Sequence, residues 1–149
     1  MKLIILRLTF FLLLSPAAFA QQLSIYSPAG KAIGGYDPVA YFTDSRPVMG
    51  NADLAYASQG VNWYFATAQN RDAFKASPDT YLPQYGGYCA YGTSQGHKAP
   101  TQPDAWTINE GKLYLNYNTK VKTLWDKDRP GHIKKADAIW PTIQDKDAH

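Results

Sequence analysis

The side chains best suited to chemistry lie close together, in residues 85–97. This stretch contains the only cysteine of the chain, Cys89, and one of its three histidines, His97. A thiolate and a neutral imidazole are ligands that Cu(I) and Zn(II) accept. Four glycines in the same stretch would weaken a regular helix or strand, but they permit tight turns. The sequence therefore predicts that the chain doubles back here and brings Cys89 and His97 to one site.

Two ligands alone hold a metal weakly, and two other side chains are candidates to complete the set. His132 lies near the expected start of the last helix, and Met49 offers a thioether from a loop. The predicted site is thus Cys89, His97, His132 and Met49 around copper or zinc. The structural alternative is that Cys89 is a small buried side chain, which is a common role of an unpaired cysteine.

Tyrosines surround the cysteine on both sides. Tyr85, Tyr88 and Tyr91 could line an aromatic pocket for a small ligand. The alternative is a turn in the core, where glycines allow one backbone segment to approach another. Both interpretations stay open at the level of sequence.

Catalysis has one candidate, a Cys89–His97 pair acting in thiol or acyl chemistry. The sequence supplies no recognisable third residue to orient the pair. A non-catalytic domain that binds a metal ion or small ligand is therefore the first interpretation. A ligand-free module that contacts a protein partner is the second, and a thiol-dependent enzyme is the third.

The first 20 residues have the organisation of a secretory signal peptide. Lys2 and Arg7 supply positive charge, an apolar run follows at residues 8–14, and residues 18–20 read Ala-Phe-Ala. Cleavage is expected after Ala20, and the apolar run is shorter than the ~20 residues that span a bilayer. The protein is expected to be periplasmic or secreted, with no membrane span after cleavage.

The charge of the chain argues against nucleic acid as a partner. The formal net charge is +3, and loss of Lys2 and Arg7 with the leader leaves +1. No block of lysine and arginine is present, so a phosphate backbone has no basic surface to bind. A single cysteine also excludes an internal disulfide, so stability must come from packing.

The elements that position these residues are expected to be short. Two hairpins are predicted, with turns at Gln59-Gly60 and Glu110-Gly111. Strand pairs mixed with helices, without regular βαβ alternation, predict a small single α+β domain of antiparallel hairpins and several short helices. In the second hairpin, Leu113 and Leu115 alternate with polar neighbours, which predicts one buried face.

Capping residues mark the expected helix starts. Asp37, before Pro38, is expected to cap a short helix, and helices are also predicted after Thr67 and Asn118. The last helix is expected to end before Pro141. The domain is predicted to span residues 34–143, between an extended arm at 21–33 and a polar tail at 144–149. No internal repeat is recognisable.

Several motifs resemble the YHS-domain family. Residues 35–42 (Gly-Tyr-Asp-Pro-Val-Ala-Tyr-Phe), 63–65 and 84–90 carry the resemblance. Residues 106–108 and 112–118 resemble a small exported bacterial subgroup of that family. The resemblance implies a small α+β module of a kind that handles metals.

The sequence departs from the family at the metal ligands. Relatives usually have a cysteine after Asp-Pro-Val, where this chain has Ala40. Ala66 and Asn70 stand near the later cysteine positions. The resemblance therefore implies the fold but not the family's cysteine metal site.

Overall fold

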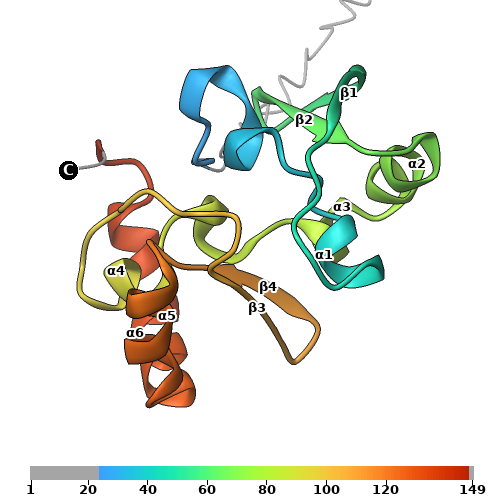
Figure 1. Ribbon diagram of the computed structural model, residues 1–149. Coiled ribbons are helices and arrows are strands. Elements are labelled where there is room, and N and C mark those ends of the chain that lie inside the picture. Colours follow the sequence, from blue (N-terminus) through green and yellow to red (C-terminus); the bar gives the residue numbers. More distant parts are fainter. Residues whose placement is uncertain (1–23, 148–149) are drawn as a thin grey trace, which may run out of the picture.

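The computed structural model describes residues 24–147, which form two antiparallel β-hairpins packed with short helices (Figure 1). The prediction of a small single α+β domain is confirmed. The hairpins are β1 (Asn51–Ser58) with β2 (Val61–Phe65), and β3 (Trp106–Asn109) with β4 (Lys112–Leu115).

Both hairpin turns follow from local sequence. Gln59 and Gly60 have φ of 55° and 73°, and Glu110 and Gly111 have φ of 50° and 72°. Two consecutive residues of positive φ are the geometry that matches the twist of paired strands. The turns predicted from the sequence are confirmed at both positions.

The helices that follow Thr67 and Asn118 begin at polar caps. The Thr67 hydroxyl accepts the N–H of Asn70 at 3.0 Å, and the Asn118 amide oxygen accepts the N–H of Val121 at 2.9 Å. The α-helices are α1 (Ala40–Thr43), α2 (Ala68–Ala76), α3 (Pro78–Tyr81), α4 (Ala90–Ser94), α5 (Thr119–Asp126) and α6 (Arg129–Ile143). Three 3₁₀ turns are η1 (Pro28–Gly30), η2 (Ala32–Gly35) and η3 (Gln84–Gly87).

Helix α6 runs through Pro141, so the prediction that it ends before this residue is wrong. Proline offers no N–H to the carbonyl of Asp137, which removes one helical hydrogen bond. The last turn is held instead by packing, because Ile143 is buried, and by the N–H of Gln144, which donates to the carbonyl of Trp140 at 2.9 Å.

The described chain consists of two units with the same order of elements. The first is η2-α1-β1-β2-α2-α3 and the second is η3-α4-β3-β4-α5-α6. Each unit opens on a turn of three residues with positive φ. These are 44°, 71° and 86° in Ile33-Gly34-Gly35, and 54°, 62° and 83° in Tyr85-Gly86-Gly87. No repeat was recognisable in the sequence, but the structure contains one, so the prediction that the chain has no internal repeat is wrong.

Residues at equivalent positions have the same structural roles in the two units. The same number of residues separates the caps Thr67 and Asn118, the two hairpin turns, and the buried aromatic residues Phe74 and Trp125. The cross-strand pair Tyr56–Trp63 likewise corresponds to Thr107–Tyr114. The repeat preserves capping, turn and core roles, with few identical residues.

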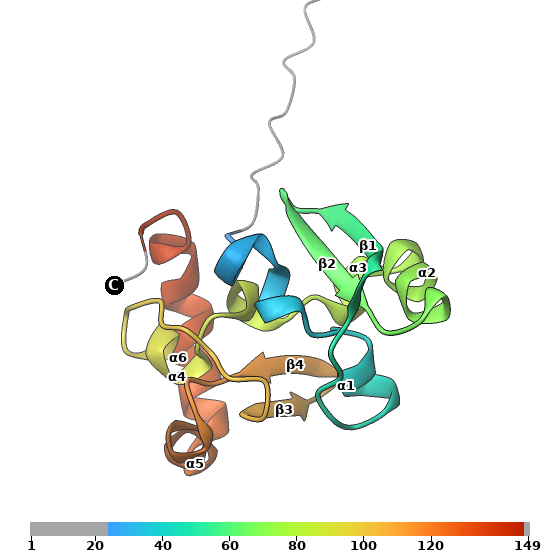
Figure 2. The same ribbon diagram turned by 45° about the horizontal axis from the view of Figure 1, so that its top comes forward.

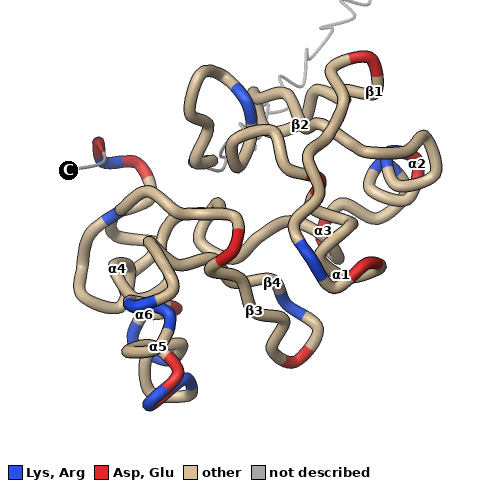
Figure 3. Tube along the Cα trace, in the orientation of Figure 1, with Lys and Arg blue, Asp and Glu red and all other residues tan. Residues whose placement is uncertain are grey.

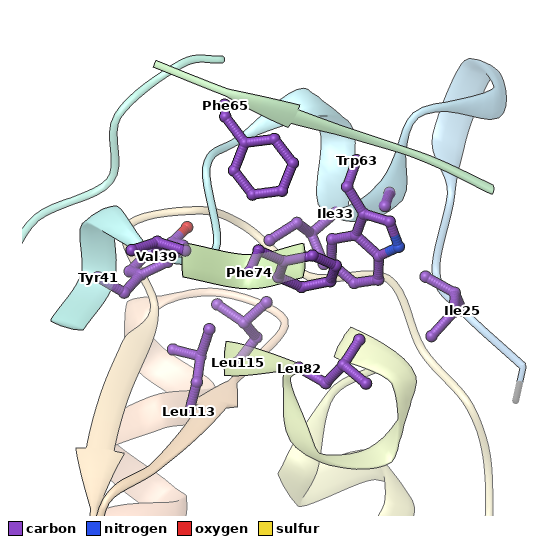
Figure 4. Packing of buried hydrophobic residues seen from close by; sticks show 11 residues of the cluster. Ile25, Ile33, Val39, Tyr41, Trp63, Phe65, Phe74, Leu82, Leu113 and Leu115 are labelled. Atoms are coloured by element: carbon purple, nitrogen blue, oxygen red, sulfur yellow. The ribbon is translucent and has the colours of Figure 1, made fainter. Parts of the chain in front are cut away.

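Hairpin β3–β4 lies between helices α4–α6 on one side and α1 on the other (Figure 2), and its residues belong to two hydrophobic clusters. Leu113 and Leu115 belong to the larger cluster, with Trp63 and Phe74 (Figure 4). Tyr114, on the opposite face of the strand, packs on Trp125 in the smaller cluster. The expectation of a single buried face is therefore wrong, because this hairpin joins the two units.

The segment expected to be an extended arm contributes to the core. Residues 28–35 form η1 and η2, and Ile25, Ala32 and Ile33 are buried in the larger cluster. The Tyr26 N–H donates to the carbonyl of Gly86 at 2.9 Å. The start of the described chain is therefore held against η3.

Basic and acidic residues are interspersed along the described chain (Figure 3). Within residues 24–147, no helix combines the length and apolar character needed to cross a bilayer. The predicted signal peptide lies outside the described residues.

Candidate functional site

Cys89 lies at the start of α4 and is buried, with 1% of its surface exposed. Its Sγ accepts the backbone N–H of Tyr117 at 3.2 Å and that of Gly92 at 3.4 Å. The amide oxygen of Asn116 lies 3.5 Å from Sγ. Burial raises the pKa of the Cys89 thiol, and the backbone donors oppose this shift only in part. The arrangement favours a neutral thiol as a hydrogen-bonding cap.

The first unit contains the counterpart of this cap. Asp37 is fully buried, and its Oδ1 accepts the N–H groups of Val39 and Ala40 at 2.8 and 3.3 Å. Its Oδ2 accepts the N–H of Ala66 and the side-chain amide of Asn70, both at 2.8 Å. Ala66 and Tyr117 are equivalent residues after the second strand. Cys89 thus occupies the position at which the first unit places a structural acceptor.

His97 and His132 both lie near α4 and approach different residues of it. His97 is exposed, and its Nε2 would lie 3.3 Å from a methyl group built on Gly92. His132 is half-buried on α6, with its Nδ1 3.2 Å from the Ser94 hydroxyl and its ring edge-on to Tyr91. Each histidine therefore contacts α4 through a residue other than Cys89.

Met49 lies in the other unit. Its backbone pairs with Tyr36, its sulfur lies near Gly35, and the side chain is 58% exposed. Across residues 24–147, no group of three or more His, Cys, Asp or Glu side chains is arranged to hold a metal ion. Cys89, His97 and His132 gather in the second unit, whereas Met49 lies beside η2.

The three candidate pocket tyrosines separate into different environments. Tyr88 packs between Tyr26 and Trp140, with the Lys98 ammonium 5.1 Å from its ring centre. Tyr91 faces His132. Only Tyr85 lines the groove that runs between η3, β4 and α6.

This groove has a volume of about 450 Å³, within the range of small-molecule sites. Its apolar residues Ile25, Leu82 and Pro83 are buried and form the floor, whereas the acids Asp79 and Asp137 are exposed and form part of the rim. The lining consists of Ile25, Asp79, Leu82, Pro83, Gln84, Tyr85, Gly86, Lys112, Asp137 and Trp140.

Tyr85 fixes the position of the Asp137 carboxylate. The tyrosine is 5% exposed, and its hydroxyl donates to Asp137 Oδ1 at 2.8 Å. Burial, and then the neighbouring Asp137, raise the pKa of Tyr85 well above its usual range. The phenol therefore stays protonated and donating, and the second carboxylate oxygen of Asp137 is left as an acceptor.

The positive φ of Tyr85 is not itself a sign of function. A bulky residue in this region is strained, and such strain often marks functional sites. Ile33 has the same conformation at the equivalent turn of the first unit, with φ of 44°. The strained turn belongs to the repeated fold, whereas the hydroxyl that reaches Asp137 occurs in the second unit alone.

Sequence reasoning singled out neither Asp137 nor Trp140. A signal for both was present, because Ile133, Asp137 and Trp140 are spaced at i, i+4 and i+7 and so share one face of α6. Trp140 is half-buried, and its ring centre lies 6.1 Å from that of Tyr85. The spacing places an acid and an indole side by side.

A buried lysine ties the start of the described chain to the end of α6. Lys98 is 6% exposed, and its Nζ donates to the hydroxyl of Ser24 at 3.3 Å and the carbonyl of Gln144 at 3.1 Å. The carbonyl follows α6, where a helix end favours a cation. Lys98 thus ties Ser24, next to the groove residue Ile25, to the end of α6.

No family model, curated protein or solved structure matches this chain. The resemblance to the YHS-domain family therefore stays a prediction made on motifs alone.

Proposed function

We propose that this protein is an exported, non-catalytic binding domain that takes a small organic ligand in the groove between η3, β4 and α6. The observation that carries the proposal is the Tyr85–Asp137 hydrogen bond of 2.8 Å at the groove wall. A carboxylate held by a buried phenol is oriented before a ligand arrives, which lowers the entropy lost on binding.

The composition of the groove supports the same function. Leu82, Pro83 and Ile25 give an apolar floor, while Gln84 and Asp137 supply polar groups at the rim. Small-molecule sites typically combine an apolar lining with a few placed polar groups. Export rests on the predicted leader and belongs to the proposal.

Metal binding at Cys89 and His97 stays a prediction, and no contact of the described residues favours it. The Cys89 sulfur already accepts two backbone N–H groups. The test is the affinity for Zn(II), and for Cu(I) under reducing conditions, of wild type, Cys89→Ser and His97→Ala. Equal affinity of all three proteins removes Cys89 and His97 from any metal site.

A screen of small organic fragments by ligand-observed NMR tests the groove. The proteins are the mature wild type, Trp140→Leu and the control Asp53→Asn, which changes an exposed carboxylate on β1 outside the groove. We expect one class of fragments to bind wild type and the control but not Trp140→Leu. Fragments that bind all three proteins alike would contradict the proposal.

An interaction module without a small ligand has one observation in its favour. Tyr117, just before α5, is 48% exposed, and Leu124, on α5, is 42% exposed. Self-association of wild type that Leu124→Lys abolishes in sedimentation would support this second function.

A further inference from the structure

The groove carries more negative than positive charge. Asp79 and Asp137 are its acids, and Lys112 is its base. Within residues 24–147, no lysine or arginine forms an ion pair with either acid. Asp137 is instead hydrogen-bonded to a neutral phenol, so its charge remains available to a ligand.

The aromatic side chains of the groove also favour a positively charged ligand. Trp140 and Tyr85 both line it. The face of an aromatic ring attracts a cation and repels an anion, and indole is the strongest of the protein rings in this respect. The cation-attracting ring of Trp140 and the oriented carboxylate of Asp137 thus belong to one groove.

The base does not counterbalance this preference. Lys112, at the first position of β4, is exposed, as both acids also are, and a single base offsets only one of the two acids. The apolar floor of Ile25, Leu82 and Pro83 then accommodates a hydrocarbon portion of the ligand. The net negative charge, the aromatic rings and the apolar floor of the groove all suit one kind of ligand.

We propose that the ligand is an organic cation, an amine with a short apolar body whose ammonium group lies between Asp137 and Trp140. The inference rests on the proposed binding function and names the class of its ligand. The ammonium donates to the free oxygen of Asp137, and the apolar body lies over Leu82 and Pro83.

The test uses three compounds of similar size and different charge. Phenethylamine is the cation, 3-phenylpropionate the anion and 2-phenylethanol the neutral compound. Calorimetry of the mature chain should show the amine binding at least about fivefold more tightly than the other two. The affinity for the amine should also fall with added salt, because the charges are partly exposed.

Variants test whether the groove is the source of the preference for the amine. Asp137→Asn should remove the preference for the amine, and Tyr85→Phe should reduce it, because the carboxylate loses the group that orients it. Asp53→Asn should bind like wild type. Retention of the full preference by a folded Asp137→Asn protein would overturn the inference.

The outcomes separate the two proposals. If the alcohol or the anion binds more tightly than the amine, and Trp140→Leu abolishes that binding, the cation inference is overturned. The proposed binding function then still stands. No binding of the amine overturns the inference. Failure of the fragment screen as well overturns the proposed function.

Discussion

Cys89 combines a thiol with the position of a structural cap. Its sulfur is buried and accepts two backbone N–H groups, and burial raises its pKa. The thiolate is the reactive form of cysteine, and the raised pKa keeps most of Cys89 in the thiol form. We therefore expect a thiol reagent to label native protein slowly and to label it rapidly once denaturant unfolds it. Equal rates before and after unfolding would show that Cys89 is accessible and reactive.

Asp37 is the most heavily bonded polar side chain of the first unit. Asp37→Ala removes the acceptor of four hydrogen bonds, including those from the buried N–H groups of Val39 and Ala40. We expect a loss of about 3–5 kcal/mol in the free energy of unfolding. Thr67→Ala, which removes one exposed cap, should cost about 1 kcal/mol. Denaturant unfolding measures both, and equal losses would contradict the account of Asp37.

Individual residues were predictable where their role is local. The cap at Asp37 follows from its position before Pro38, whereas its contacts to Ala66 and Asn70 depend on the folded chain. The partnership of Tyr85 with Asp137 joins residues far apart in sequence. No spacing rule reports such a contact, although the helix period placed Asp137 beside Trp140.

The element that joins the start of the described chain to the second unit is η3. A methyl group built on Gly86 would collide with the carbonyl oxygen of Ser24, whereas one built on Gly111 meets no atom within 4 Å. Both glycines have positive φ, 62° and 72°. Gly111→Ala should therefore cost about 1 kcal/mol through backbone strain alone.

Gly86→Ala should cost about 2 kcal/mol more than Gly111→Ala, because Ser24 must move. Chemical denaturation of the two variants gives the difference. Similar stabilities would mean that residues 24–26 do not pack firmly on η3.

Elements were predictable because their signals are short in range. The hairpin turns and helix caps lie within a few residues of the structure they specify. The repeat was missed because equivalent positions keep a role and change the residue, as Asp37 and Cys89 do. The end of α6 was missed because packing of Ile143 offsets the hydrogen bond that Pro141 removes.

At the scale of the whole molecule, burial of tyrosines makes stability depend on alkaline pH. Burial raises the pKa of Tyr26, Tyr41, Tyr85 and Tyr114 above the ordinary value of about 10. The unfolded chain releases these protons near that pH while the folded chain keeps them. Their contribution is therefore complete below about pH 10 and is lost as pH rises further.

We expect cooperative unfolding above about pH 10, with tyrosinate absorbance and loss of helical circular dichroism in one transition. Titration of all the tyrosines near pH 10 without loss of structure would contradict this prediction.

The central claim concerns where the molecule binds: in the groove of Tyr85, Asp137 and Trp140, and not at Cys89. Backbone and indole N–H shifts of the mature chain, followed by NMR during titration with phenethylamine, test it directly. The account predicts that the signals of Asp137 and Trp140 move together, while those of Gly92 and Tyr117, which bond the Cys89 sulfur, stay in place. Shifts centred on Gly92 and Tyr117, or none in the groove, would contradict it.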